Sequence, residues 1–251
     1  MTYAGKRVLV TGGGSGAGAN LALGFARAGA EVVICGRRVE ALARTVAESM
    51  GAQHPAIRAL PCDVTDEASV AELYRAAGPI DIVIANAGQA DSVPFHRTTL
   101  DQWNAMLAVN LTGVFLTFRD GLRQMPGWGR LIAVASTAGV KGYAKIAPYA
   151  AAKHGVMGIV RSLALEVAKG PVTVNAICPG FLDTDMTDRS VQIISEKTGR
   201  SLAEARKALE AMSPQNRLYA PSEVTAAALY LAGPGAEGVN GQAIVISGGE
   251  A

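Results

Sequence analysis

Tyr149 and Lys153 are the first residues to suggest chemistry, because they stand four positions apart in the alanine-rich stretch PYAAAKHG. In a helix this spacing places both side chains on the same face. A phenol has a reference pKa of about 10 and is a poor acid or base at neutral pH. A neighbouring ammonium group favours the phenolate and lowers the pKa of the phenol. The pair is therefore a candidate for general acid–base catalysis.

Two further polar residues lie where a catalytic site could use them. Ser136 ends the apolar run LIAVAS, and a hydroxyl at the carboxyl end of a strand points into the ligand crevice of an open α/β sheet. There it could hold a carbonyl oxygen beside Tyr149. Asn110 interrupts an apolar helical pattern, in which Asn is a poor helix former. A buried Asn must find partners, and the alternative is a solvated position on the helix surface.

The elements that must position these residues alternate along the chain. Short apolar runs rich in β-branched residues predict strands that are covered on both faces. Longer stretches with helical periodicity separate these runs. We expect strands at 7–11, 31–36, 57–62, 80–85, 129–135, 172–177 and 242–246. We expect helices at 17–28, 39–49, 66–77, 100–124, 147–168 and 222–231.

This alternation predicts an α/β fold with a single Rossmann-type, doubly wound parallel sheet of about seven strands and helices on both faces. No linker divides the sequence, so we expect residues 1–251 to form a single domain. The exception to the alternation is the segment 185–213, which contains no strand pattern. We interpret this segment as an inserted helical pair, which would be either a lid or a simple packing excursion. Ser201 is its candidate N-cap, and its apolar positions with helical spacing are Leu202, Ala205, Leu209 and Met212.

The stretch TGGGSGAG follows the first expected strand and opens the first expected helix. That context is the one a dinucleotide-binding loop requires, because glycines permit a tight turn and the helix N-terminus supplies N–H donors to the pyrophosphate. The alternative is a loop that is merely flexible. Two registers fit the motif at this point: Gly14, Gly16 and Ala19, or Gly12, Gly16 and Gly18.

The end of the second expected strand bears on the choice of cofactor. In the stretch VVICGRRVE, Arg37 and Arg38 stand where an acidic residue would bind the adenosine ribose of NAD. A guanidinium group can pair with a 2′-phosphate and stack on adenine. We therefore predict a preference for NADP(H), with NAD(H) as the alternative. An ordinary basic helix start would also explain the two arginines, although cations are unfavourable at a helix N-terminus.

The composition argues against several other classes of protein. A formal net charge of +2 indicates neither nucleic-acid binding nor a polybasic membrane anchor. No apolar segment approaches the roughly 18 residues of a membrane span. The three cysteines and three histidines lack the spacing of metal ligands, so we expect no metal site. Isolated cysteines in apolar runs indicate free, buried thiols, and together with the lack of a signal peptide they favour the cytoplasm.

Together these residues resemble the classical short-chain dehydrogenase/reductase family over essentially the whole chain. The family's catalytic tetrad is matched in order and spacing by Asn110, Ser136, Tyr149 and Lys153. The glycine loop resembles the family's cofactor loop in the register Gly12, Gly16 and Gly18. Further matches to cofactor-contacting positions of the family are Asp63, Val64, Asn86, Gly88, Pro179, Gly180 and Thr184.

The resemblance implies reversible hydride transfer between NAD(P)(H) and an alcohol/ketone pair. Tyr149 would donate the proton to the carbonyl oxygen, which Ser136 would orient. Lys153 would lower the pKa of Tyr149 and hold the nicotinamide ribose. Asn110 would anchor a water that connects Lys153 to solvent. The resemblance also implies a homotetramer.

Two positions depart from the family's pattern. Ala85 replaces the first Asn of the family's Asn-Asn-Ala-Gly, and Ser15 stands where many members that prefer NADP carry Lys or Arg. Because Ser15 is neutral, the prediction of NADP(H) depends on Arg37 and Arg38.

The sequence constrains the substrate least. The resemblance favours a 3-oxoacyl thioester or a similar β-keto compound. A cyclic or aryl alcohol/ketone is the alternative within the family, and a non-catalytic NAD(P)-binding sensor is the alternative from another class. No obvious cluster of cations awaits a free carboxylate, although Lys141, Lys145 and Arg189 are near enough in sequence to be considered. The residues that we expect at the pocket are mostly apolar: Gln89, Ala90, Val140, Tyr143, Ile146, Phe181 and Met186.

Overall fold

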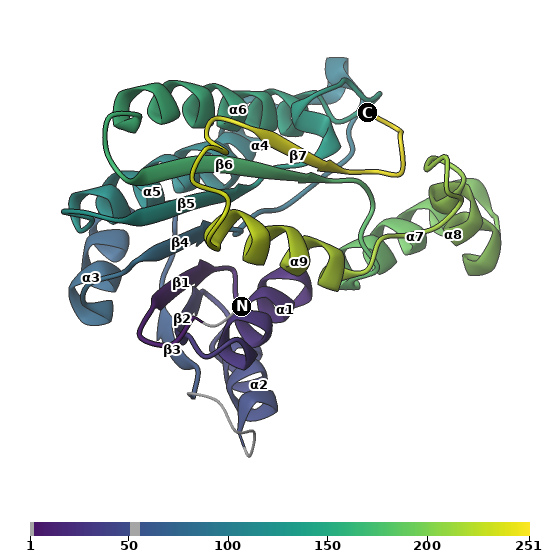
Figure 1. Ribbon diagram of the computed structural model, residues 1–251. Helices are drawn as coiled ribbons and strands as arrows, with labels where there is room; N and C mark the ends of the chain where they lie inside the picture. The colour runs from purple at the N-terminus through teal and green to yellow at the C-terminus, as the bar shows by residue number, and fades with distance from the viewer. Residues whose placement is uncertain (1–2, 51–55) are drawn as a thin grey trace.

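A seven-stranded parallel sheet forms the centre of the molecule (Figure 1). The computed structural model describes residues 3–50 and 56–251. The strands lie in the order β3-β2-β1-β4-β5-β6-β7, so the order reverses between β1 and β4. Their bounds are β1 Arg7–Thr11, β2 Glu31–Gly36, β3 Arg58–Pro61, β4 Ile82–Ala85, β5 Gly129–Val134, β6 Val172–Pro179 and β7 Ala243–Ile246. The predicted fold class is therefore confirmed.

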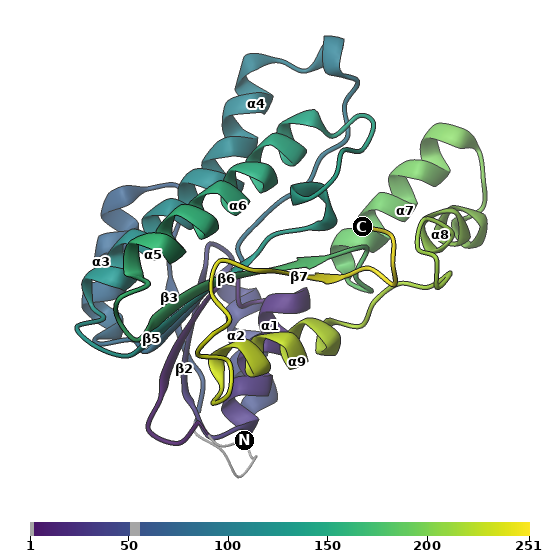
Figure 2. The same cartoon turned by 45° about the horizontal axis from the view of Figure 1, so that its top comes forward.

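Helices cover both faces of the sheet, as Figure 2 shows. On one face the core joins strand residues such as Leu9 and Val83 to Val70 of α3 (Glu67–Ala77) and Phe118 of α5 (Gly113–Arg123). On the other face, the intervening strand residues pack against α1 (Gly16–Arg27), α2 (Val39–Ser49) and α9 (Pro221–Ala232). Successive strand residues point to opposite faces, and both faces of the sheet are covered, which is why the strand sequences are mostly apolar.

One expected helix has an interruption that the sequence pattern did not predict. The stretch 100–124 forms α4 (Leu100–Leu107), a π-helical turn (Ala108–Thr112) and α5, in place of one regular α-helix. A π-turn holds an additional residue between hydrogen-bonded partners and is frequent at functional sites. Asn110 lies in this turn.

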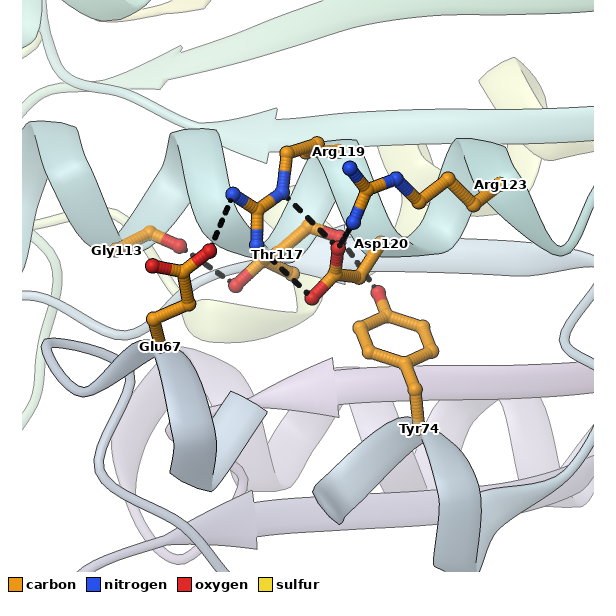
Figure 3. Close-up of polar contacts among 7 residues, drawn as sticks. All are labelled: Glu67, Tyr74, Gly113, Thr117, Arg119, Asp120 and Arg123. Atoms are coloured by element: carbon orange, nitrogen blue, oxygen red, sulfur yellow. Dashed lines mark hydrogen bonds and ion pairs between the residues drawn. The ribbon is translucent and has the colours of Figure 1, made fainter. Parts of the chain in front are cut away.

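Helix α5 is fixed to α3 by the polar contacts shown in Figure 3. The buried hydroxyl of Tyr74 donates to the main-chain oxygen of Thr117 at 2.6 Å. The guanidinium group of Arg119 pairs with Glu67 at 2.7 Å and with Asp120 at 3.0 Å. Because α5 continues from the π-helical turn, these contacts also fix the orientation of that turn.

The segment 185–213 forms the predicted helical pair, α7 (Asp185–Thr198) and α8 (Leu202–Glu210), which projects beyond the sheet in Figure 1. Ser201 caps α8, since its hydroxyl accepts the main-chain N–H of Glu204. Ala205 and Leu209 are buried as expected, but Leu202 is 57% exposed. The exposure of Leu202 shows that the apolar face of α8 is only partly covered within this chain.

Helices α1 and α9 pack closely at Gly24. A Cβ atom at this position would lie 2.3 Å from Cγ2 of Thr225. We therefore expect Gly24→Ala to lower the free energy of unfolding by about 1–3 kcal/mol, although Ala is the better helix former by ~1 kcal/mol. Thr225→Ser removes the obstructing methyl group and keeps the hydroxyl, which donates to Asn20 at 2.7 Å.

The double variant Gly24→Ala/Thr225→Ser should recover most of the lost stability. Urea unfolding of the wild type, both single variants and the double variant makes a complete double-mutant cycle. Purely additive losses would contradict a direct clash between the two positions.

Candidate active site

Tyr149 and Lys153 lie on the first two turns of α6 (Ala147–Val167), a helix that has Pro148 in its first turn. The Lys153 ammonium nitrogen is 5.6 Å from the centre of the Tyr149 ring. It donates to the main-chain oxygen of Val134, at the end of β5, at 2.9 Å. Lys153 is only 3% exposed, and this burial lowers its pKa to about 8. The ammonium group is thus held near the Tyr149 ring at the carboxyl edge of the sheet.

Ser136 is the second residue after β5 and faces Tyr149. Burial raises the pKa of Tyr149, and a hydrogen bond with the Ser136 hydroxyl opposes this rise. The same hydroxyl accepts the main-chain N–H of Ala138 at 3.1 Å, which fixes its position. The structure therefore brings together the phenol, the hydroxyl and the ammonium group of the predicted tetrad.

Asn110 is completely buried, so the alternative of a solvated helix position is wrong. Its amide nitrogen donates to the main-chain oxygens of Gln89 at 2.9 Å and Met106 at 3.1 Å. Its side-chain oxygen accepts the main-chain N–H of Gln89 at 3.2 Å. A Cβ atom at Gly88 would lie 2.9 Å from that oxygen and 3.7 Å from the Lys153 nitrogen. Asn110 therefore ties the turn after β4 to the helix and stands close to the lysine.

The glycine loop packs tightly against the turn that follows β4. Gly12 and Gly16 have φ values of 68° and 54°, which favour glycine. A Cβ atom at Gly18 would lie 2.2 Å from the main-chain oxygen of Gly12. The sequence offered no specific reason for Gly13 and Gly14. In the fold, a Cβ atom at Gly13 would lie 2.5 Å from Ile34 and one at Gly14 would lie 3.0 Å from Ala41.

Thr11 is a residue of this region that the predicted site omitted. Its hydroxyl accepts the main-chain N–H groups of Asn86 and Ala87, each at 3.0 Å. In return the Asn86 side chain donates to the main-chain oxygen of Thr11 at 3.0 Å. Its place at the end of the first strand, directly before the glycines, is the signal that could have identified it.

The start of α1 is suited to an anionic group. Its N-cap Ser15 makes no side-chain capping bond, and the first turn has no acidic residue. The exposed Arg38 guanidinium donates to the Ser15 hydroxyl at 3.1 Å, and Arg37 lies 3.9 Å from the Asp63 carboxylate. Positive charge and main-chain N–H donors thus meet at one helix N-terminus, which is the arrangement that binds phosphate groups. The residues therefore fit the phosphates of an NAD(P) cofactor.

The remaining predicted cofactor positions lie around the same edge of the sheet. Pro179 ends β6, and Gly180 donates its N–H to the main-chain oxygen of Ile246 at 2.9 Å. Thr184 precedes α7, and its methyl group would lie 3.3 Å from a Cβ atom at Gly16. The segment after β6 therefore reaches across to the glycine loop.

Val64 packs against the start of α5 at this edge of the sheet. A Cβ atom at Gly113, at the start of α5, would lie 2.9 Å from the Val64 side chain. Its neighbour Asp63 is fixed by the main-chain N–H of Thr65, a bond that helps to lower the pKa of the aspartate.

A cavity of about 310 Å³ opens beside the candidate tetrad, and its lining is mostly apolar, with Asp91, Thr98 and Gln102 as polar residues that the sequence did not predict. Of the expected pocket residues, Gln89 and Ala90 line this cavity, whereas Phe181 packs against the apolar cluster of α7 and α8. The cavity is lined by Gln89, Ala90, Asp91, Val93, Thr98, Gln102, Ala105, Met106 and Pro148.

Within residues 3–50 and 56–251, no group of three or more His, Cys, Asp or Glu side chains is arranged to hold a metal ion. His54 lies outside these residues. No helix in the described part of the chain has both the length and the apolar character needed to cross a membrane.

Comparison with known proteins identifies the family. The short chain dehydrogenase family matches residues 6–193. A putative ketoacyl reductase of Streptomyces coelicolor is 37% identical over 249 residues, which cover 96% of this chain and 95% of the relative. D-beta-hydroxybutyrate dehydrogenase of Rhizobium meliloti is 34% identical, with coverage of 97% and 98%.

The fold agrees with that of a solved relative. The crystal structure of a variant of actinorhodin polyketide ketoreductase with NADPH superposes with a TM-score of 0.92 at 36% identity, covering 98% of this chain and 97% of the other. The chain therefore belongs to the short-chain dehydrogenase family and is an NAD(P)-dependent oxidoreductase that acts on hydroxyl or keto groups.

Proposed function

We propose that the protein is a ketoreductase that reduces the keto group of a 3-oxoacyl thioester or similar β-keto compound, with NADP(H) as its preferred cofactor. The observation that carries this proposal is the meeting of Tyr149, Ser136 and the buried Lys153 at the carboxyl edge of the sheet. The ketoacyl reductase among its relatives supports the substrate class.

Each residue of the cluster has a distinct task in this proposal. The bound cofactor supplies or accepts the hydride. Tyr149 donates the proton to the carbonyl oxygen, and Ser136 hydrogen-bonds the same oxygen and orients it. Lys153 places a positive charge beside the phenol and so favours loss of its proton. Donors placed in advance around a developing oxyanion are worth roughly 10²–10³ in rate each at comparable sites.

Asn110 acts as a positioning residue in this scheme. Its amide group is used by main-chain atoms of Gln89 and Met106. Through these bonds it fixes the turn that carries Gly88, which borders the Lys153 nitrogen. The proposed role of Asn110 is thus to keep Gly88 next to the Lys153 nitrogen. Anchoring a water molecule, as the family resemblance implies, would be a second role.

The preference for NADP(H) is supported by the charge at the adenosine end of the site. Arg38 is held over the glycine loop by its bond to Ser15, and Arg37 lies beside Asp63. The solved relative that contains NADPH is consistent with this choice. Gly12, Gly16, Gly18, Asn86 and Thr184 are proposed to shape the rest of the cofactor site.

A cytoplasmic homotetramer built from single-domain subunits, with 185–213 as a substrate-side insertion, is part of the proposal. Exposed apolar side chains on α5 and α6 support subunit contacts through these helices, since Phe115 is 45% exposed and Leu165 is 80% exposed. A cyclic or aryl ketone remains the second candidate substrate.

Tyr149→Phe removes the proposed proton donor and keeps the ring. We expect turnover of a β-ketoacyl thioester to fall at least about 10²-fold, while the affinity for NADPH stays nearly unchanged. Turnover is followed by NADPH absorbance and affinity by NADPH fluorescence. Tyr230→Phe, on the exposed surface of α9, serves as the matched control. Undiminished kcat in Tyr149→Phe would refute the assignment.

Lys153→Met tests the cost of the buried ammonium group. The folded pKa of about 8 lies below the ordinary value of 10.5, so between these pH values the unfolded chain binds more protons. The stability of the wild type relative to Lys153→Met should therefore rise as the pH increases from 8 to 10.5. Below pH 8 the wild type should be least stable relative to the variant, by on the order of 3 kcal/mol compared with the difference above pH 10.5.

Urea unfolding of cofactor-free protein at several pH values measures this difference. Lys169→Met, a change at an exposed lysine, is the control. A difference in stability between Lys153→Met and the wild type that does not vary with pH would contradict the buried charge.

Arg38→Ala should distinguish the two cofactors. Loss of a charge-assisted contact to a 2′-phosphate should weaken NADPH binding roughly tenfold to a hundredfold, and NADH binding should change little. Dissociation constants from nicotinamide fluorescence provide the measurement, with Arg44→Ala on the exposed face of α2 as the control. An equal effect on both cofactors would argue against phosphate recognition by Arg38.

A further inference from the structure

Lys141, Tyr143 and Glu250 form a polar cluster beside the candidate active site, and we name it the Glu250 cluster. The Glu250 carboxylate accepts the Tyr143 hydroxyl at 2.5 Å and pairs with the Lys141 ammonium nitrogen at 3.1 Å. Lys141 also donates to the main-chain oxygen of Glu250 at 3.0 Å. The Glu250 side chain is only 7% exposed. A buried carboxylate with these partners is a fixed feature of the site.

The turn after β7 carries Glu250 back to the sheet. Gly248 and Gly249 have φ values of 59° and 93°, which residues with a side chain rarely adopt. A Cβ atom at Gly180 would lie 3.4 Å from the second oxygen of the Glu250 carboxylate. The carboxylate therefore lies next to Gly180, one of the predicted cofactor positions in the segment that follows β6.

The cluster also borders the catalytic residues. The Tyr143 hydroxyl lies 2.8 Å from the hydroxyl of Thr137, the residue directly after Ser136. Burial and the hydrogen bond to Glu250 raise the pKa of Tyr143, and the charge of Tyr149 adds to this effect. The Glu250 cluster thus contacts the residue after Ser136 and lies near Tyr149.

The three cations considered as partners for a substrate carboxylate are Lys141, Lys145 and Arg189. Lys141 is neutralised by Glu250, and Lys145 is exposed. Arg189, also exposed, donates to the main-chain oxygen of Asp185 at 3.2 Å. None of these three cations is a buried, unpaired partner for a substrate carboxylate, because Glu250 pairs with Lys141 and so withholds it from a substrate. A carboxylate that enters a site with no free cation gives up its hydration without a charged partner, which selects against an anionic ligand.

We propose that Glu250 makes the substrate site selective for charge, so that it takes neutral β-keto esters and thioesters and rejects free β-keto acids. This inference rests on the proposed ketoreductase function and narrows its substrate class. It bears on a contrast among the relatives, since one is named for a ketoacyl group and another for hydroxybutyrate.

The test compares ethyl acetoacetate with acetoacetate, the same β-keto compound as a neutral ester and as an anion. We expect the wild type to show a kcat/KM with NADPH at least about tenfold higher for the ester. Glu250→Gln keeps the shape of the side chain, removes its charge and leaves the Lys141 ammonium unneutralised. The ester-to-acid ratio of kcat/KM should therefore fall about tenfold in this variant.

Lys141→Met makes the opposite change, because it leaves the Glu250 carboxylate without its cation, and it should raise the ester-to-acid ratio. Glu48→Gln, on the exposed surface of α2, is the control and should leave the ratio unchanged. If thermal denaturation shows that Glu250→Gln does not fold, Lys141→Met decides the question by the same ratio.

The outcomes separate this inference from the function on which it rests. Reduction of the ester with a ratio that neither variant changes would overturn the inference and leave the ketoreductase function in place. A wild type that discriminates tenfold, with the two variants moving the ratio in opposite directions, would support the inference. A wild type that reduces neither compound nor any β-ketoacyl thioester would overturn the proposed function, and the inference with it.

Discussion

The burial of one ammonium group, that of Lys153, is the constraint on which the rest of the site depends. Taking an ammonium group out of water is unfavourable, and here the opposing contact is a hydrogen bond to the main-chain oxygen of Val134. The ammonium nitrogen lies 5.6 Å from the centre of the Tyr149 ring, in surroundings with a lower dielectric constant than water. The protein thus gives up stability to hold a charge beside the proposed proton donor.

The parallel sheet determines where that charge can be used. The carboxyl ends of β1, β4, β5 and β6 meet at one edge, near the point where the strand order reverses. This edge brings together Gly12, Asn86, Ser136 and Pro179, which are distant in the sequence. The helices that follow these strands then add a helix N-terminus at one end of the edge and the Tyr149 phenol at the other.

Much of the fold and the candidate site was predictable from local patterns, and what was not depends on contacts between elements. The strand β6 extends to Pro179, beyond its predicted end, because Cys178 and Pro179 pair with β7. The π-helical turn at Asn110 was not foreseen, since its apolar pattern resembles that of a regular helix. The turn depends instead on bonds from Asn110 to Gln89, in a loop that lies elsewhere in the sequence.

The sequence by itself determined three features. These are the succession of strands and helices along the chain, the two apolar faces of the strands, and the placement of Tyr149 and Lys153 on one side of a helix. Periodicity and spacing report these features because they depend on residues close together in the chain. Only the tertiary structure decided that Lys141 meets Glu250, a residue 109 positions away. Such a pairing depends on the order of strands in the sheet and on the turn after β7, and no local pattern records either of them.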